Sequence, residues 1–443
     1  MKEEKMEKTM ERMTEVTTGG MMEDAMEGMA EGRAADKTGP VTIGEIAAIC
    51  REVEEIYKYL HRHPELGFEE YNTSKFILDK LAEYRIEARQ TGGTGVIATI
   101  YGSRPGKTVA IRADMDALPL TEEADVPYKS CRNGVMHACG HDAHVAMLLG
   151  AAGYLSGQRE KLCGNVRLIF QPAEEGMQPE RLAEIVADGG SERGGAATMI
   201  AKGALEGADC CYAIHVFPDL PTGTLAVHRE RAMASSDIFK MDICGKGGHG
   251  SSPETAVDPV GALAAVLAAF NAFPSRELSA LDSCSLSVGT INTDSVWNAI
   301  PDKIHVEGGV RLYDNKIREY TFKRLPQIAE GICSAHRCHV KFERQQGYDP
   351  TVNAPEISER MAAVASRVFG EGRGTLMERP AMGSEDAGYY FQEVPGAIGW
   401  LGCHAEGTRE SVPHNPGFYI DLNALGYGVL FHINMVFDIL GEE

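Results

Sequence analysis

The chain has 443 residues, of which 43% are apolar and 24% are charged, and this length favours two domains. Its formal net charge of −21 argues against a nucleic-acid or anionic-membrane partner, because both require a basic surface. No apolar run approaches a membrane span, and 11 irregularly spaced cysteines without a CxxC pair favour a reducing, cytoplasmic setting.

The first segment, residues 1–40, is rich in Met, Glu, Gly and Lys and ends at Gly39-Pro40. This composition predicts a disordered or weakly helical tail. Met6, Met10 and Met13 recur at helical spacing, so an amphipathic helix that binds a partner is the alternative.

Strands and helices alternate in the next segment, residues 41–234, and this alternation predicts a mixed, mainly parallel sheet. Ligands of such sheets bind beyond the carboxyl ends of the strands. Acidic and imidazole side chains stand at these ends and are expected to converge. They are Asp114, Asp116, Glu174, Glu175 and His215. The predicted elements are helices at 46–60, 72–84 and 145–157 and strands at 95–101, 108–112, 166–170 and 211–216.

After residue 234 the pattern changes to β-α-β-β-α-β, which predicts a ferredoxin-like domain of residues 235–346. The α/β pattern resumes in residues 347–443. The fold class is therefore α/β, with a catalytic domain in two segments interrupted by an inserted lid. The elements expected in the lid are strands at 236–244, 283–291, 303–313 and 338–346 and helices at 257–273 and 315–335.

Groups that bind metals are concentrated between Met136 and His144, where nine residues hold three histidines, one thiol and one carboxylate. A helical apolar run follows, so Cys139 and His141 are expected on a loop at a helix N-terminus. The helix dipole there favours a thiolate. A buried cysteine among hydrogen-bonded core histidines is the alternative.

Two further groups fit hydrolytic chemistry. Adjacent residues of an extended segment point in opposite directions, so one carboxylate of Glu174-Glu175 can bind metal while the other acts as general base. His249, in the glycine-rich lid loop 247–253, could donate to an oxyanion. A solvated glutamate pair and an ordinary hairpin turn are the alternatives. The absence of a Gly-x-Ser-x-Gly motif argues against a serine hydrolase.

Seven blocks, spread over residues 44–440, resemble the amidohydrolase branch of the dinuclear metallocarboxypeptidase/aminoacylase family. That branch includes hippurate hydrolase, indole-acetyl-amino-acid hydrolases and N-acetyldiaminopimelate deacetylase. The blocks are HRHPELGFEE at 61–70, IRADMDALPL at 111–120, MHACGHDAHVAMLLGAA at 136–152, LIFQPAEEG at 168–176, GKGGHGSSP at 245–253, GSEDAGYY at 383–390 and HNPGFYID at 414–421.

The resemblance implies two divalent metal ions, manganese or zinc, with cobalt also allowed. Glu174 is implied as general base and His249 as the lid histidine. Asp116 would orient a metal ligand, while His137, Asp142 and His144 would have supporting roles. Asn298 and Arg311 are the candidates for substrate binding. The implied metal ligands are Cys139, as a bridging thiolate, and His141, Glu175, His215 and His414.

The expected activity is hydrolysis of the amide bond of N-acyl amino acids to a carboxylic acid and a free amino acid. A metallocarboxypeptidase acting on short peptides and a catalytically silent homologue are the alternatives. A homodimer through the lid is plausible. The chain departs from the family pattern in an insertion at 177–193, which is expected to rim the site and to contain a short helix. It also has Glu254 where a histidine is expected.

Overall fold

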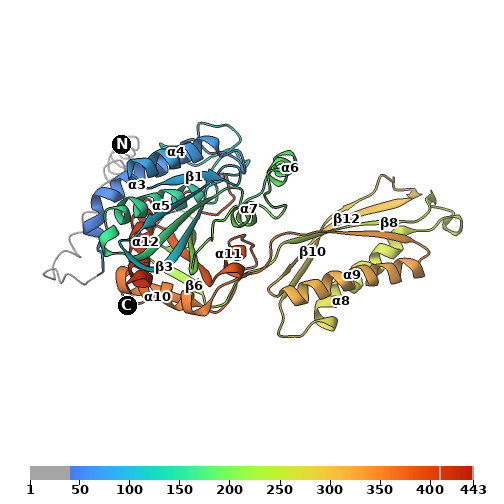
Figure 1. The fold of residues 1–443 in the computed structure, drawn as a ribbon. Helices are drawn as coiled ribbons and strands as arrows, with labels where there is room; N and C mark the ends of the chain where they lie inside the picture. The colour runs from blue at the N-terminus through green and yellow to red at the C-terminus, as the bar shows by residue number, and fades with distance from the viewer. Residues whose placement is uncertain (1–39, 409–410, 442–443) are drawn as a thin grey trace, which may run out of the picture.

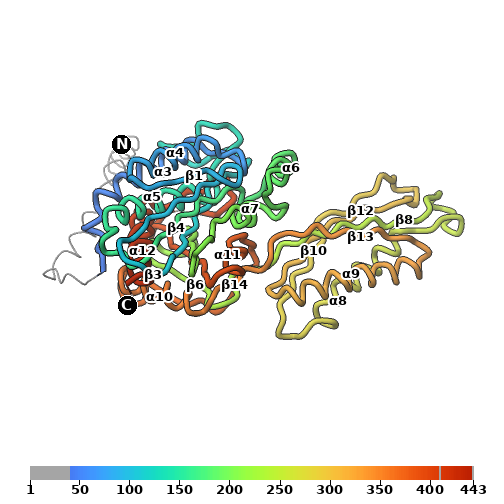
Figure 2. The backbone as a smooth tube through the Cα atoms, viewed as in Figure 1, coloured from blue at the N-terminus to red at the C-terminus, as the bar shows by residue number. Residues whose placement is uncertain are grey.

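The computed structural model describes residues 40–408 and 411–441, so the expected tail lies almost entirely outside the described residues. The chain forms a larger body and a smaller elongated body (Figure 1). It passes between them twice, through segments near residues 235 and 348 (Figure 2).

The larger body is built on an eight-stranded sheet with the order β1-β2-β4-β3-β5-β16-β6-β15. Four of its seven strand pairs are parallel: β3 with β4, β3 with β5, β5 with β16, and β6 with β15. The sheet is therefore mixed and mainly parallel, as predicted. The strands are β1 (Ala88–Thr91), β2 (Gly95–Tyr101), β3 (Arg104–Asp114), β4 (Cys163–Gln171), β5 (Cys210–Pro221), β6 (Leu225–His228), β15 (Gly374–Met377) and β16 (Gly396–His404).

Helices cover both faces of this sheet. Side chains alternate between the faces along each strand, and apolar ones point to both, so each face needs a covering layer. Val109 and Ile111 of β3 join the main core under the long helices, whereas Ala110 joins a smaller core under α7 and α11. The helices are α3 (Ala47–Arg62), α4 (Tyr71–Glu83), α5 (His141–Ser156), α7 (Gly195–Ala201), α10 (Pro355–Phe369), α11 (Gly388–Glu393) and α12 (Asn423–Leu440).

Two central helices, α5 and α12, are apolar nearly all round. The 18 residues of α12 are long and apolar enough to cross a membrane, but 78% of them are buried inside the protein. By contrast, α3 is amphipathic: Val53, Ile56, Tyr57 and Leu60 recur every three or four residues and face the core. The apolar helices are therefore central layers of the fold, and α3 forms an outer layer.

The smaller body is a four-stranded antiparallel sheet with the order β10-β12-β8-β13, on which two helices pack. Its chain order, β-α-β-β-α-β, confirms the predicted ferredoxin-like lid. From Ile304 to Leu312 of β12, buried and partly buried residues alternate strictly. The elements are β8 (Asp237–Cys244), α8 (Pro259–Glu277), β10 (Cys284–Asn292), β12 (Lys303–Leu312), α9 (Asn315–Ala335) and β13 (His339–Gln345).

Both linkers are joined by a buried ionic cluster, which we call the hinge cluster. Arg318 of α9 donates at 2.5 and 2.9 Å to Asp237, which opens β8 directly after the first linker, and to Asp349 in the second linker. Arg193, from the end of the 177–193 insertion, also pairs with Asp349 and stacks on Tyr389, with 4.1 Å from its guanidinium carbon to the ring centroid. The insertion therefore contacts the hinge of the lid.

Candidate active site

The site lies where β3, β4 and β5 meet the N-terminus of α5. Between Cys139 and His141, Gly140 has a φ of 89°, and a Cβ there would lie 2.3 Å from Cγ2 of Val216. Only glycine fits this turn without strain or clash.

β5 runs five residues beyond the expected end and continues its pairing with β16 to Pro221. His215 is therefore held inside the sheet rather than at a loose strand end.

Hydrogen bonds fix the imidazole of His215. Nδ1 lies 2.7 Å from the carbonyl oxygen of Val216, which can only accept, so Nδ1 carries the proton. Nε2 therefore presents a lone pair and lies 3.4 Å from Sγ of Cys139. Burial and the neighbouring His144 hold the pKa of His215 well below its usual value of 6.5. A neutral imidazole next to a thiol is the form that binds a divalent cation.

His141 is oriented in the same way, by the carboxylate of Asp116. Nδ1 lies 3.2 Å from Oδ1 of Asp116, while Oδ2 of Asp116 accepts from the backbone N of Glu175 at 2.9 Å. Nε2 of His141 is buried and has no hydrogen-bond partner among the described residues. It lies 3.5 Å from Asp114 and 3.9 Å from Glu175. Although burial opposes the charge, the two aspartates raise the pKa of His141 to about 10.

Glu175 and His414 form the opposite side of the site. Nε2 of His414 lies 2.9 Å from Oε1 of Glu175. The backbone N of His414 donates to the carbonyl oxygen of Ala138 at 2.7 Å, which ties the C-terminal loop to the Cys139 turn. Although burial raises the pKa of Glu175, the pairing with His414 stabilises the carboxylate and lowers this pKa overall.

These residues fit a site for divalent cations. The ligand atoms of Asp114, His141, His144 and His215 lie within 4.8 Å of one another, and so do those of Cys139, Glu175 and His414. Burial, Glu175 and Glu174 raise the pKa of the Cys139 thiol well above its usual range. A thiolate there needs a cation beside it, and the unpartnered Nε2 of His141 also faces this position.

In the first of these groups, both ring nitrogens of His144 already have hydrogen-bond partners. Its Nε2 accepts from the backbone N of Val216 at 2.9 Å, so its proton is on Nδ1, which donates to Asp114 at 2.5 Å. Asp142 binds Nδ1 of His61 at 2.6 Å behind the site. His144 and Asp142 are therefore bonded to the neighbouring strands and helix.

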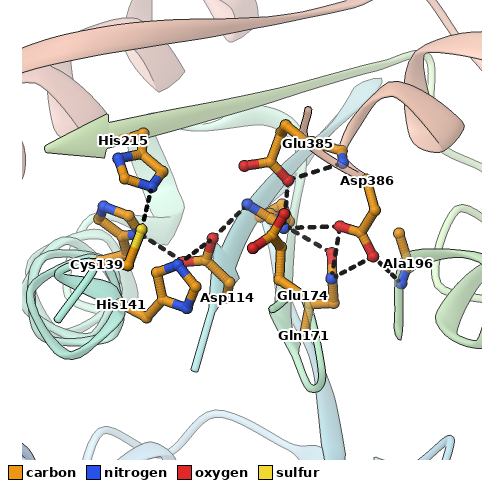
Figure 3. A network of polar contacts seen from close by, with 12 residues as sticks. Asp114, Cys139, His141, Gln171, Glu174, Ala196, His215, Glu385 and Asp386 are labelled. Atoms are coloured by element: carbon orange, nitrogen blue, oxygen red, sulfur yellow. Dashed lines mark hydrogen bonds and ion pairs between the residues drawn. The ribbon is translucent and has the colours of Figure 1, made fainter. Parts of the chain in front are cut away.

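Glu174 faces a cluster of buried carboxylates beside the candidate metal ligands (Figure 3). Burial, Glu385 and Glu175 raise its pKa well above 4.5, while Arg112 opposes the shift. Arg112 donates to Glu385 at 2.9 Å and to Asp386 at 3.0 Å. It also donates to Asp114 at 2.7 Å, and so connects the carboxylates around Glu174 to those around the histidines.

The lid residues are separate from this constellation. His249 is exposed in the two-residue strand β9 (Gly248–His249), beyond the far end of β8, and its Nδ1 lies 2.7 Å from Oγ of Ser251. A strand advances about 3.3 Å per residue, so the eight residues of β8 place this loop roughly 26 Å from the first linker. Asn298 lies beside it, because its carbonyl oxygen accepts from the backbone N of Gly250.

Arg311 lies at the hinge end of β12, and its Nη1 donates to the carbonyl oxygen of Met382 at 3.0 Å. The structure thus brings together Glu174, Asp116 and the five predicted metal ligands. In this arrangement of the lid, His249, Asn298 and Arg311 do not contact these seven residues.

Several residues of the site were not predicted from the sequence. Arg112 had no assigned role, although it lies two positions before the predicted Asp114 and on the same face of β3. Glu385 and Asp386 were within a quoted block but had no assigned role. Tyr348, whose hydroxyl donates to the carbonyl oxygen of Glu174, carried no recognisable signal.

The 177–193 insertion contains the predicted short helix, α6 (Pro179–Ala187). Ile185 packs with Phe68 and Ala173 in a small buried cluster, and Arg181 donates to the carbonyl oxygen of Phe68 at 3.1 Å. The insertion therefore packs against the turn that precedes Glu174.

Comparison with known proteins identifies relatives across most of the chain. Residues 110–437 match the model of peptidase family M20/M25/M40. Thermostable carboxypeptidase 1 of Saccharolobus solfataricus is 37% identical over 392 residues, which cover 86% of this chain and 95% of that protein. Hippurate hydrolase of Campylobacter jejuni is 34% identical over 402 residues, 90% of this chain and 99% of that protein.

A solved structure described as a dinuclear metal binding peptidase from the M20 family, the YXEP protein of Bacillus subtilis, is also similar. It superposes with a TM-score of 0.75 at 31% identity and covers 89% of this chain and 99% of its own.

Proposed function

The chain belongs to peptidase family M20/M25/M40, and from this premise we propose that it hydrolyses the amide bond of N-acyl amino acids to a carboxylic acid and a free amino acid. One observation carries the proposal: Glu174, with its raised pKa, adjoins a convergent set of thiol, imidazole and carboxylate ligands. Hippurate hydrolase, one of the relatives, acts on substrates of this class by its name.

Five residues would hold two divalent ions, with Cys139 as the shared ligand. His141 and His215 would bind one ion, and Glu175 and His414 the other. A thiolate with three imidazoles suits zinc, and manganese or cobalt is also compatible with the family. Bound divalent ions lower the pKa of water towards neutrality and polarise a carbonyl oxygen.

Glu174 is the general base and, after bond cleavage, the general acid. It takes a proton from the attacking water and returns the proton to the leaving amine, an exchange worth roughly 10²–10⁴-fold. The carboxylates of Glu385 and Asp386 favour its protonated form, which the second step requires. Asp116 accepts from Nδ1 of His141 and so orients the ring, and a bound divalent ion would take the place of the proton on Nε2.

The Glu174→Gln variant tests this assignment. We expect the variant to retain both metals in elemental analysis and to lose roughly 10²–10⁴-fold in kcat for an N-acyl amino acid. Full activity with both metals present would refute the role of Glu174.

His249 would donate to the substrate carbonyl, and Asn298 and Arg311 would bind the rest of the substrate. Because His249 lies at the outer end of the lid, this role requires the lid to swing about the hinge cluster. A His249→Ala variant is expected to lose kcat without losing metal. Equal kcat for the variant and the parent would exclude a role for His249 in the reaction.

A homodimer through the lid is part of the proposal. β10 is an edge strand, and the loop that follows it exposes Trp297 at 97% of its surface. Light scattering after gel filtration distinguishes a dimer from a monomer, and a monomer at micromolar concentration would exclude this assembly. A cytoplasmic location completes the proposal and rests on the 11 free cysteines.

Cleavage of short peptides is the second candidate, because a relative at 37% identity is a carboxypeptidase. A panel of N-acyl amino acids and matched dipeptides, assayed on metal-reconstituted protein, separates the two activities. We expect the higher kcat/KM for the N-acyl amino acids, and the reverse order would favour the carboxypeptidase.

A further inference from the structure

The turn that carries Glu174 and Glu175 is strained at its first residue. Ala173 has a φ of 51°, a conformation that residues other than glycine rarely adopt. Ala173 is also fully buried. A strained conformation persists only where the surrounding structure enforces it, so contacts from elsewhere in the chain must hold this turn.

Glu70, which precedes α4, makes the contact at the strained residue. Oε1 of Glu70 accepts a hydrogen bond from the backbone N of Ala173 at 2.9 Å. The hydroxyl of Thr94 donates to Oε2 and thereby fixes the carboxyl group. Glu70 is completely buried, and burial together with Asp116 raises its pKa to about 8. A neutral side chain of the same length is therefore a close substitute for it.

The residues before Glu70 pack against both ends of the same turn. A Cβ at Gly67 would lie 2.1 Å from the carbonyl oxygen of Gly176 and 3.0 Å from Cα of Ala173. Phe68 packs on Ala173 and on Ile185 of the insertion. The loop of residues 66–70 is thus in direct contact with the turn along its length.

Three successive residues of the turn are bound by side chains from three parts of the chain. Glu70 binds the N–H of Ala173, Tyr348 binds the carbonyl oxygen of Glu174, and Asp116 binds the N–H of Glu175. Of these three, Glu70 is bound to the residue whose conformation is strained.

We propose that Glu70 is a positioning residue for the reaction. By accepting the N–H of Ala173, it holds the strained turn from which Glu174 and Glu175 diverge, one as base and the other as metal ligand. This inference rests on the proposed roles of those two glutamates.

The experiment compares Glu70→Ala and Glu70→Gln with the matched control Glu69→Gln, which alters the neighbouring acidic residue. The first readout is amide hydrogen exchange at residues 173–176 of the full-length protein, which needs no substrate. We expect exchange at least roughly 10-fold faster in Glu70→Ala than in the parent protein and unchanged in the control, because the acceptor of the Ala173 N–H is lost.

The second readout is turnover of an N-acyl amino acid. We expect kcat to fall roughly 10–100-fold in Glu70→Ala, with KM little changed, because a small displacement of the base slows the reaction strongly. Glu70→Gln keeps an oxygen acceptor and is expected to stay within about threefold of the parent.

Unchanged exchange at residues 173–176 in Glu70→Ala would overturn the proposal, and so would a Glu70→Gln variant that loses as much kcat as Glu70→Ala. If Glu70→Ala does not fold, Thr94→Val, which frees Oε2, is measured in its place, and unchanged exchange there has the same meaning. A parent protein that turns over no N-acyl amino acid would instead refute the proposed function, while the exchange data would still decide the role of Glu70.

Discussion

Replacing Arg112 by glutamine tests how far the site depends on one buried cation. The guanidinium is 2% exposed and pairs with Asp114 and Asp386, which are fully buried, and with Glu385. Breaking a buried ion pair costs about 3–5 kcal/mol, because a charge is left without its partner. That cost is a large part of the roughly 5–15 kcal/mol by which a domain is stable, and it corresponds to a fall in Tm of about 6–20 °C.

Thermal unfolding followed by tryptophan fluorescence measures this loss. Trp400 is 5% exposed inside the catalytic domain, whereas Trp297 lies in solvent on the lid, so a Trp297→Phe background isolates the signal of the catalytic domain. Arg229→Gln is the matched control, because Arg229 pairs with Glu359 at 2.8 Å on the surface. An exposed pair is worth about 0–1 kcal/mol. Equal Tm values for the Arg112 and Arg229 variants would refute the reasoning.

Three further predictions follow from other parts of the site. The pKa of His61 is raised to about 9 despite burial, by Asp142 and Glu122, so its stabilisation is complete below pH 6.5 and is lost as the pH rises through 9. Urea unfolding should therefore show a decline of up to about 3 kcal/mol over that range, and His61→Gln should flatten it. Tyr348→Phe removes the hydrogen bond to Glu174 and should lower kcat without lowering metal content; an unchanged kcat would count against this contact. Chelation should abolish activity and leave the two sheets folded, as monitored by far-UV circular dichroism; loss of the circular dichroism signal would show that the metals hold the fold.

The elements of the fold were predictable because their patterns are local. The apolar run of β4 and the 3.6-residue period of α3 depend on neighbouring residues, and α9 (Asn315–Ala335) begins and ends where the sequence indicated. The convergence of the candidate metal ligands was predictable for a different reason. The carboxyl ends of parallel strands share one edge of a sheet, so Glu175 and His215 were expected to lie close together.

The remaining features depend on geometry that no local pattern encodes. Arg112 bonds Asp386 across 274 positions of sequence, and Glu70 binds the strained Ala173 across 103 positions. The separation of His249 from Glu174 depends on the angle of the two linkers, which the hinge cluster sets in three dimensions.

The position of β16 in the sheet has a consequence for synthesis of the protein on the ribosome. β16 (Gly396–His404) lies between β5 and β6, yet the chain must first complete the whole lid before β16 is made. The lid is one contiguous segment with its own core, so it can fold while the larger sheet still exposes two unpaired strand edges. Nascent chains that stop after residue 346 should therefore carry a folded lid beside an open, aggregation-prone sheet, and the last hundred residues close that sheet.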